Sequence, residues 1–60
     1  MNYLVGITSN KGRIESKKFN TLDECYDYIL SFNGDEILTH YRIMDLKTKE
    51  IIEDEQGKRG

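Results

Sequence analysis

The sequence TLDECYDYILSF, from Thr21 to Phe32, predicts a helix, and the rest of the chain must supply the surface on which that helix packs. Thr21 and Glu24 form a capping box, in which the Thr21 hydroxyl accepts from the Glu24 N–H and the Glu24 carboxylate reaches back to the Thr21 N–H. Asn33-Gly34 predicts a left-handed stop after the helix. Apolar residues recur at spacings of three and four and mark one buried stripe: Leu22, Cys25, Ile29 and Phe32.

Four other segments alternate apolar and polar residues as strands do, with turn residues between the members of each pair. The predicted strands cover Tyr3–Thr8, Arg13–Phe19, Glu36–Asp45 and Glu50–Asp54. The second is polar on both faces and is expected at a sheet edge, whereas the third is the most apolar and is expected in the centre.

This order of elements predicts an α+β fold, a small β-β-α-β-β domain in which two antiparallel hairpins form a sheet and one helix packs on one face. The single domain is expected over residues 1–55, and residues 56–60 are expected to form a disordered polar C-terminal tail. The pattern leaves open the strand order and the choice of the sheet face that the helix covers.

One helix can cover only one face of a four-stranded sheet, so the apolar residues predicted on the other face need an explanation. The helix side is expected to hold Tyr3, Val5, Ile7, Phe19, Ile37, Tyr41, Ile43 and Ile52. The opposite face then keeps aliphatic residues that form a candidate interaction surface, with a histidine and an arginine beside them: Leu4, Ile14, Leu38, Met44 and Ile51, with His40 and Arg42. The alternative is that these side chains are scattered singly and covered by Lys and Arg stems.

A chain of 60 residues buries a small core, so a supplement to its stability is expected. One cysteine excludes an internal disulfide, and Cys25 with His40 cannot form a closed zinc site. No cofactor or metal is therefore expected, and self-association as a homodimer is the favoured supplement.

The candidate catalytic pair, Cys25 and His40, is predicted not to meet, because Cys25 lies on the helix stripe and His40 on the far sheet face. Cys25 is expected to be a small core residue. His40 and Arg42 could recognise a phosphate or carboxylate, but a cross-strand pair of Arg42 with Glu53 is favoured. The sequence contains no Gly-rich phosphate loop, metal-ligand spacing or dinucleotide fingerprint, so an enzyme is not expected.

The charge of the chain is mildly acidic, with a net charge of −2 and a pI near 5.2, which weighs against nucleic acid or an anionic membrane as the partner. Asp23, Glu24 and Asp27 form a candidate acidic helix face that could dock on a basic surface, although complementing the helix dipole explains much of it. No membrane span or signal peptide is expected, and a free thiol fits the cytoplasm, which for a viral protein means the host cytoplasm.

The leading hypothesis is a small non-enzymatic protein-binding module. The size of the chain, its content of Asn, Lys and Ile, and its lack of a catalytic set look like the small accessory reading frames of bacteriophages and mobile elements. That likeness implies a protein that binds and inhibits or modulates a host protein. The alternative is a small nucleic-acid-binding regulator, and an enzyme using Cys25 and His40 comes third. The sequence does not identify the partner.

Overall fold

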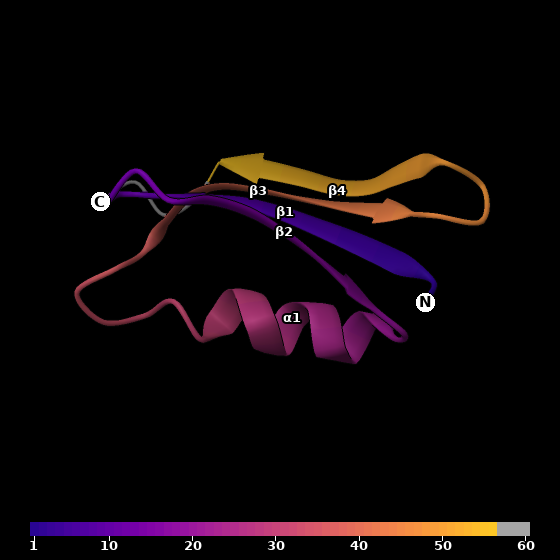
Figure 1. Ribbon diagram of the computed structural model, residues 1–60, viewed down its shortest axis with the longest axis horizontal. Helices are drawn as coiled ribbons and strands as arrows, with labels where there is room; N and C mark the ends of the chain where they lie inside the picture. The colour runs from indigo at the N-terminus through magenta and orange to yellow at the C-terminus, as the bar shows by residue number, and fades with distance from the viewer. Residues whose placement is uncertain (57–60) are drawn as a thin grey trace.

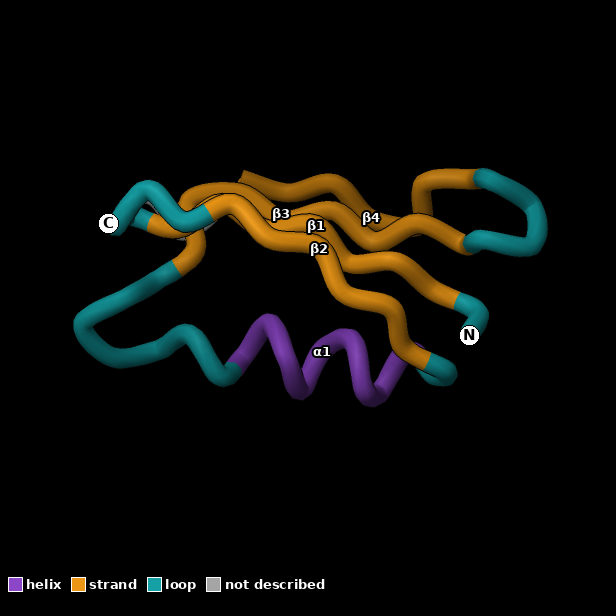
Figure 2. The backbone as a smooth tube through the Cα atoms, in the orientation of Figure 1, coloured by secondary structure: helices purple, strands orange, loops and turns teal. Residues whose placement is uncertain are grey.

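The computed structural model describes residues 1–56, which contain four strands and one helix (Figure 1). The strands are β1 (Tyr3–Ser9), β2 (Ile14–Phe19), β3 (Leu38–Asp45) and β4 (Glu50–Gln56), and the helix between β2 and β3 is α1 (Leu22–Leu30). Figure 2 shows two layers, with the strands in one and α1 in the other. The predicted β-β-α-β-β fold is confirmed.

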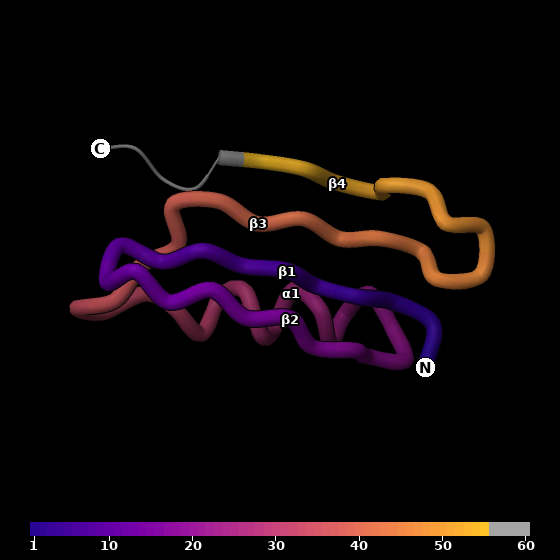
Figure 3. Tube along the Cα trace, turned by 45° about the horizontal axis from the view of Figure 1, so that its top comes forward, coloured from indigo at the N-terminus to yellow at the C-terminus, as the bar shows by residue number. Residues whose placement is uncertain are grey.

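The strands form one sheet in the order β2-β1-β3-β4, and every neighbouring pair is antiparallel. Figure 3 shows this order across the sheet. The two strands that carry the buried residues Val5, Ile7, Leu38 and Ile43 lie in the centre, where both their edges are paired. The polar β2 lies at an edge. Both expectations for strand position are therefore confirmed.

The two ends of α1 are built differently from one another. At the start, the Thr21 Oγ1 accepts from the Glu24 N–H at 3.2 Å, as predicted, but the Glu24 carboxylate accepts from the Asn20 N–H at 3.0 Å and not from Thr21. At the end, Ser31 keeps a right-handed helical conformation, and its hydroxyl donates to the Tyr28 carbonyl at 2.6 Å. The left-handed stop predicted at Asn33-Gly34 is wrong, because the serine hydroxyl satisfies a terminal carbonyl without it.

Both hairpin turns follow the local chemistry of their residues. Gly12 has a φ of 83° in the first turn, a conformation that glycine adopts without steric cost. In the second turn, the Asp45 Oδ1 accepts from the Lys47 N–H at 2.8 Å, and Lys49 takes a φ of 65°. The turn carboxylate thus stabilises a loop that closes on a non-glycine residue in the left-handed region.

The core lies between α1 and the two central strands. Cys25 and Ile29 from the helix pack against buried side chains of β1 and β3, and half-buried aromatic residues surround this cluster. The buried members are Val5, Ile7, Cys25, Ile29, Leu38 and Ile43. The predicted helix stripe is confirmed at its two central positions.

A β-bulge at Thr39 changes the face on which one predicted surface residue lies. Thr8 pairs with His40 and Ser9 pairs with Leu38, so Thr39 is the extra residue in β3. An extra residue reverses the alternation of side chains beyond it. Leu38 therefore points to the helix side, where only 6% of it is exposed. Its predicted place on the opposite face is wrong.

A second bulge, at Ile52, alters the pairing of β4 with β3. Met44 pairs with Ile51 as predicted, but Ile43 pairs with Glu53 and Arg42 with Asp54. The predicted pairs of Ile43 with Ile52 and of Arg42 with Glu53 are wrong, because Ile52 is the extra residue. Ile52 is exposed rather than packed beneath the helix.

The chain beyond β4 was predicted to form a polar tail over residues 56–60. Gln56 pairs with His40 at the end of β4, and residues 57–60 lie outside the described part of the chain. In residues 1–56, no helix has the length and apolar character needed to cross a membrane.

Candidate functional site

The sheet face opposite α1, here called the open sheet face, brings together most of the residues predicted for the interaction surface. Cross-strand pairing places Leu4, Ile14, His40, Arg42, Met44 and Ile51 on it, together with Gly6, Thr8, Ser16, Lys18 and Asp54. Leu38 is the one predicted member that the bulge at Thr39 removes.

An apolar row crosses three strands of the open sheet face. Leu4 pairs with Met44, and Met44 pairs with Ile51, so the three side chains are direct neighbours on β1, β3 and β4. Leu4 and Met44 are half-buried, and 46% of Ile51 is exposed. Ile14, at the start of β2, is 78% exposed and stands apart from the row.

A hollow of about 280 Å³ lies in the middle of the open sheet face, where Gly6 contributes no side chain. Leu4, Ile14 and Met44 line its apolar part, and Ser16 and Arg42 flank Gly6 on the neighbouring strands. A Cβ atom at Gly6 would have only the Ser16 Oγ nearby, at 3.9 Å, which is ordinary contact. Gly6 also lacks a positive φ, so neither the backbone nor internal packing requires glycine here.

His40, Arg42 and Asp54 form a charged cluster beside this hollow. The His40 Nε2 lies 2.5 Å from the Asp54 Oδ1, and the Arg42 Nε donates to the Asp54 Oδ2 at 3.2 Å. The hydrogen bond from His40, with help from the nearby Arg42 charge, lowers the pKa of the Asp54 carboxyl. Because both basic groups are paired with one carboxylate, the cluster is a cross-strand ion pair rather than a free anion site.

Cys25 and His40 lie on opposite sides of the sheet. Cys25 is fully buried in the helix-side core, and burial, followed by the nearby Glu24 charge, raises the pKa of its thiol. A thiol of this kind is a poor nucleophile because little of it is ionised at neutral pH. The prediction that Cys25 is a shielded core residue is confirmed.

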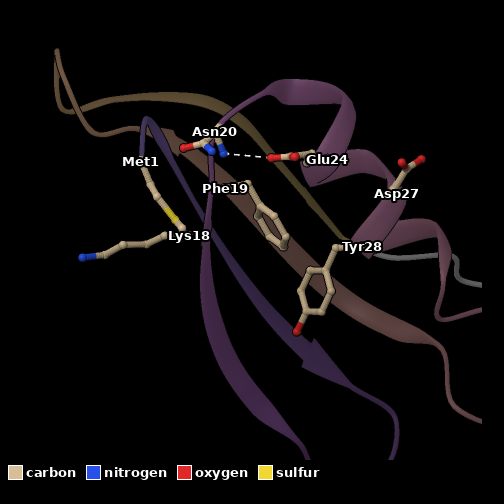
Figure 4. Close-up of a pocket in the computed structure, with 7 residues that line it drawn as sticks. All are labelled: Met1, Lys18, Phe19, Asn20, Glu24, Asp27 and Tyr28. Carbon is tan, nitrogen blue, oxygen red and sulfur yellow. Dashed lines mark hydrogen bonds between the residues drawn. The ribbon is translucent and has the colours of Figure 1, made fainter.

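The acidic helix face carries Asp23, Glu24 and Asp27, all exposed, with no basic residue in the last turn of α1. A shallow hollow of about 560 Å³ lies beside the first turns of the helix (Figure 4). In Figure 4 the Lys18 side chain points away from Asp27, and the Phe19 and Tyr28 rings lie between them. The polar groups of this hollow therefore do not converge on a common point.

Glu53 and two tyrosines form a hydrogen-bonded cluster that links the helix to β4, and the sequence pattern did not reveal it. The Tyr26 hydroxyl of α1 donates to the Glu53 Oε1 at 2.5 Å, and the Tyr41 hydroxyl of β3 donates to the Glu53 Oε2 at 3.1 Å. The hydrogen bond to Glu53 is the main cause that raises the pKa of Tyr26. Burial, followed by the same carboxylate, raises the pKa of Tyr41 to about 12. The bulge at Ile52 turns Glu53 to the helix side, and periodicity alone could not reveal it.

Comparisons of the chain with protein families, with curated proteins and with solved structures find no match. Any assignment of function therefore rests on the surfaces described above.

Proposed function

We propose that this chain is a small non-enzymatic protein-binding module that forms a homodimer through its open sheet face. The observation that supports this proposal is the apolar row of Leu4, Met44 and Ile51 on a face that no segment of residues 1–56 covers. A solvated antiparallel face normally carries polar residues at these positions. A contiguous apolar surface of this kind is typical of protein contacts.

The same face also carries a projection and a hollow that suit a symmetric contact. Ile14 is the most exposed large apolar residue of the sheet, and the hollow at Gly6 lies beside it. A two-fold interface brings the same patch of both subunits together, so it needs a surface that complements itself. In the proposed dimer, Ile14 of each copy occupies the hollow at Gly6 of the other.

The dimensions of the domain limit the size of this contact. The molecule measures 33 × 17 × 16 Å, so its broad face is smaller than the roughly 800 Å² per partner that a standard-size interface buries. The core of each subunit contains six buried apolar residues. Burial of the open sheet face would add to this small core without a disulfide or metal.

Met44→Glu tests the proposal, because Met44 lies in the middle of the apolar row. An unpaired charge buried in an interface costs several kcal/mol, so we expect the variant to sediment as a monomer at concentrations where the wild type is a dimer. Lys47→Gln is the matched control, since it makes the same change in net charge on an exposed turn residue and should leave the dimer intact.

Sedimentation velocity over a concentration series distinguishes the outcomes. Circular dichroism of both variants shows whether the helix-side core is retained. A wild type that stays a monomer of about 7 kDa at high micromolar concentration would overturn the homodimer. A folded Met44→Glu variant that dimerises as well as the wild type would show that the open sheet face is not the contact.

A further inference from the structure

The helix layer covers only part of its side of the sheet. Strands lie about 4.8 Å apart, so four of them span about 15 Å between the axes of the outer strands, whereas one helix is about 10 Å in diameter. The backbone of α1 approaches β1, β2 and β3 but not β4. Figures 1 and 3 show α1 beneath β1 and β2, with β4 beyond it. The helix side of β4 is therefore free of a covering element within residues 1–56.

An apolar groove of about 360 Å³ opens beside this uncovered area. The end of α1 contributes Ile29 and Leu30, the α1–β3 connection contributes Phe32 and Ile37, and Tyr41 of β3 lines it as well. Leu30 is 67% exposed and adds a large aliphatic side chain to the wall of the groove. The groove thus presents apolar surface that α1 does not use for its own packing.

The wall of this groove that comes from the connection is held in place by the first hairpin turn. The Asn10 N–H donates to the Ile37 carbonyl at 2.9 Å, and the Ile37 N–H donates to the Asn10 Oδ1 at 3.1 Å. The Ser9 hydroxyl donates to the Glu36 carboxylate at 2.6 Å. Because both sides of Ile37 are anchored, the groove is formed before a partner arrives, which lowers the entropic cost of binding.

Acidic side chains predominate in the elements next to the groove. Of the basic side chains, Arg13 pairs with Glu36 at 3.2 Å, and Arg42 of β3 lies on the open sheet face, where it pairs with Asp54. The segment 20–41 contains five Asp or Glu residues and no Lys or Arg, and β4 contains four Asp or Glu residues and no Lys or Arg. Glu53 and Glu55 turn to the helix side, next to Tyr41. The Glu53 carboxylate is held by the hydroxyls of Tyr26 and Tyr41, so it presents a negative charge in a defined position.

We infer that this groove binds an amphipathic helix of a partner protein, with an apolar stripe against Leu30 and Tyr41 and Lys or Arg side chains toward Glu53 and Glu55. The apolar stripe of a helix suits the apolar lining of the groove, and basic flanks complement the Glu53 and Glu55 carboxylates of β4. A second copy of the chain is a poor occupant, because its α1 carries Asp23, Glu24 and Asp27 and no Lys or Arg. The inference deepens the proposal of a binding module but uses a surface other than the open sheet face.

The test is selection from a displayed library of amphipathic helices against the full chain. Every helix in the library has a Leu stripe at positions i, i+3, i+4 and i+7, and its flanking positions vary among Lys, Arg, Gln and Glu. We expect enriched helices to carry Lys or Arg on the flanks. We also expect the affinity of a synthetic enriched helix to fall as salt is raised, because salt screens charge pairs.

Leu30→Lys should lower the affinity of the chain for the synthetic helix by about tenfold or more, since it removes an apolar contact and adds a repelling charge. Asp27→Asn is the matched control, because it makes the same change in net charge on α1 outside the groove and should change affinity little. Met44→Glu should bind the helix as the wild type does, so the outcome does not depend on the dimer.

Three results would overturn the inference. One is enrichment of no helix or of acidic helices. Another is enriched helices whose affinity is the same for Leu30→Lys and the wild type. The last is binding that Met44→Glu abolishes and Leu30→Lys preserves, which would place the contact on the open sheet face and support the proposed function alone.

Discussion

Replacing Gly6 with valine separates what the fold needs from what the proposed interface needs. In the isolated domain the added side chain enters the hollow of about 280 Å³, and its Cβ meets nothing closer than the Ser16 Oγ at 3.9 Å. Glycine in a strand interior is unfavourable, and a β-branched residue there gains up to about 1 kcal/mol. For a domain of this size, that gain corresponds to an increase in Tm of about 4–8 °C.

In the proposed dimer the same substitution fills the space that Ile14 of the other copy occupies. Overpacking of a close contact costs about 1–3 kcal/mol, and the two-fold dimer contains two such contacts, so the dissociation constant of the dimer should rise by about 30-fold or more. We therefore expect a variant whose domain is at least as stable as the wild type and whose dimer is weaker. These opposite changes distinguish an interface residue from a core residue.

The assay pairs sedimentation equilibrium, which measures the dissociation constant, with thermal unfolding at a concentration where both proteins are monomers, because association itself raises Tm. Gly34→Ala is the control, since an added Cβ meets nothing within 4 Å there and Gly34 lies outside the open sheet face. A large loss of domain stability in Gly6→Val would show that the fold requires glycine. Unchanged association would show that the hollow is not part of the interface.

Three further predictions test the core and the tyrosine pair. Ile29→Ala should lose about 2–5 kcal/mol and be largely unfolded by circular dichroism at 25 °C, because Ile29 is buried in a small core; a wild-type thermal midpoint would contradict this. Cys25 should resist a thiol reagent in the native protein at pH 8 and react fully in denaturant, since it is buried and its pKa is raised; rapid native labelling would contradict its burial. The raised pKa of Tyr41, about 12, means that the folded chain holds this proton more tightly, so its contribution to stability is complete below pH 10 and is lost as pH rises toward 12. An absorbance titration should show raised pKa values for Tyr26, Tyr28 and Tyr41, with Tyr41 ionising near pH 12; in Glu53→Gln the pKa of Tyr41 should fall but stay raised, because burial is its largest cause. Four tyrosines that all ionise near pH 10 would contradict it.

The elements of this fold could be predicted because each one depends on contacts within a few residues. The cap at Thr21, the turn carboxylate of Asp45 and the positive φ of Gly12 are local properties of the chain. The helix stripe around Cys25 and Ile29 follows from helical periodicity, which does not depend on the partner surface. The polar character of β2 was likewise enough to predict an edge strand.

The two candidate surfaces could be predicted from the sequence to different extents. Leu4, Met44 and Ile51 could be assigned to one face, because plain alternation holds along the parts of the strands that contain them. Leu38 could not, since the bulge at Thr39 moves it into the core. The helix-side groove was not foreseen, because it exists only where α1, the α1–β3 connection and β3 meet.

The sequence alone determined the number, type and order of the elements, the buried stripe of α1 and the polar edge at β2. Only the tertiary structure decided the order β2-β1-β3-β4, the pairing of Arg42 with Asp54 and the position of Glu53 between two tyrosines. The physical reason is that strand order and bulges are set by hydrogen bonds between residues far apart in the chain. A single extra residue, Thr39 or Ile52, reverses the alternation of faces between the residues before it and the residues after it, and nothing in its neighbouring residues marks it as the extra one.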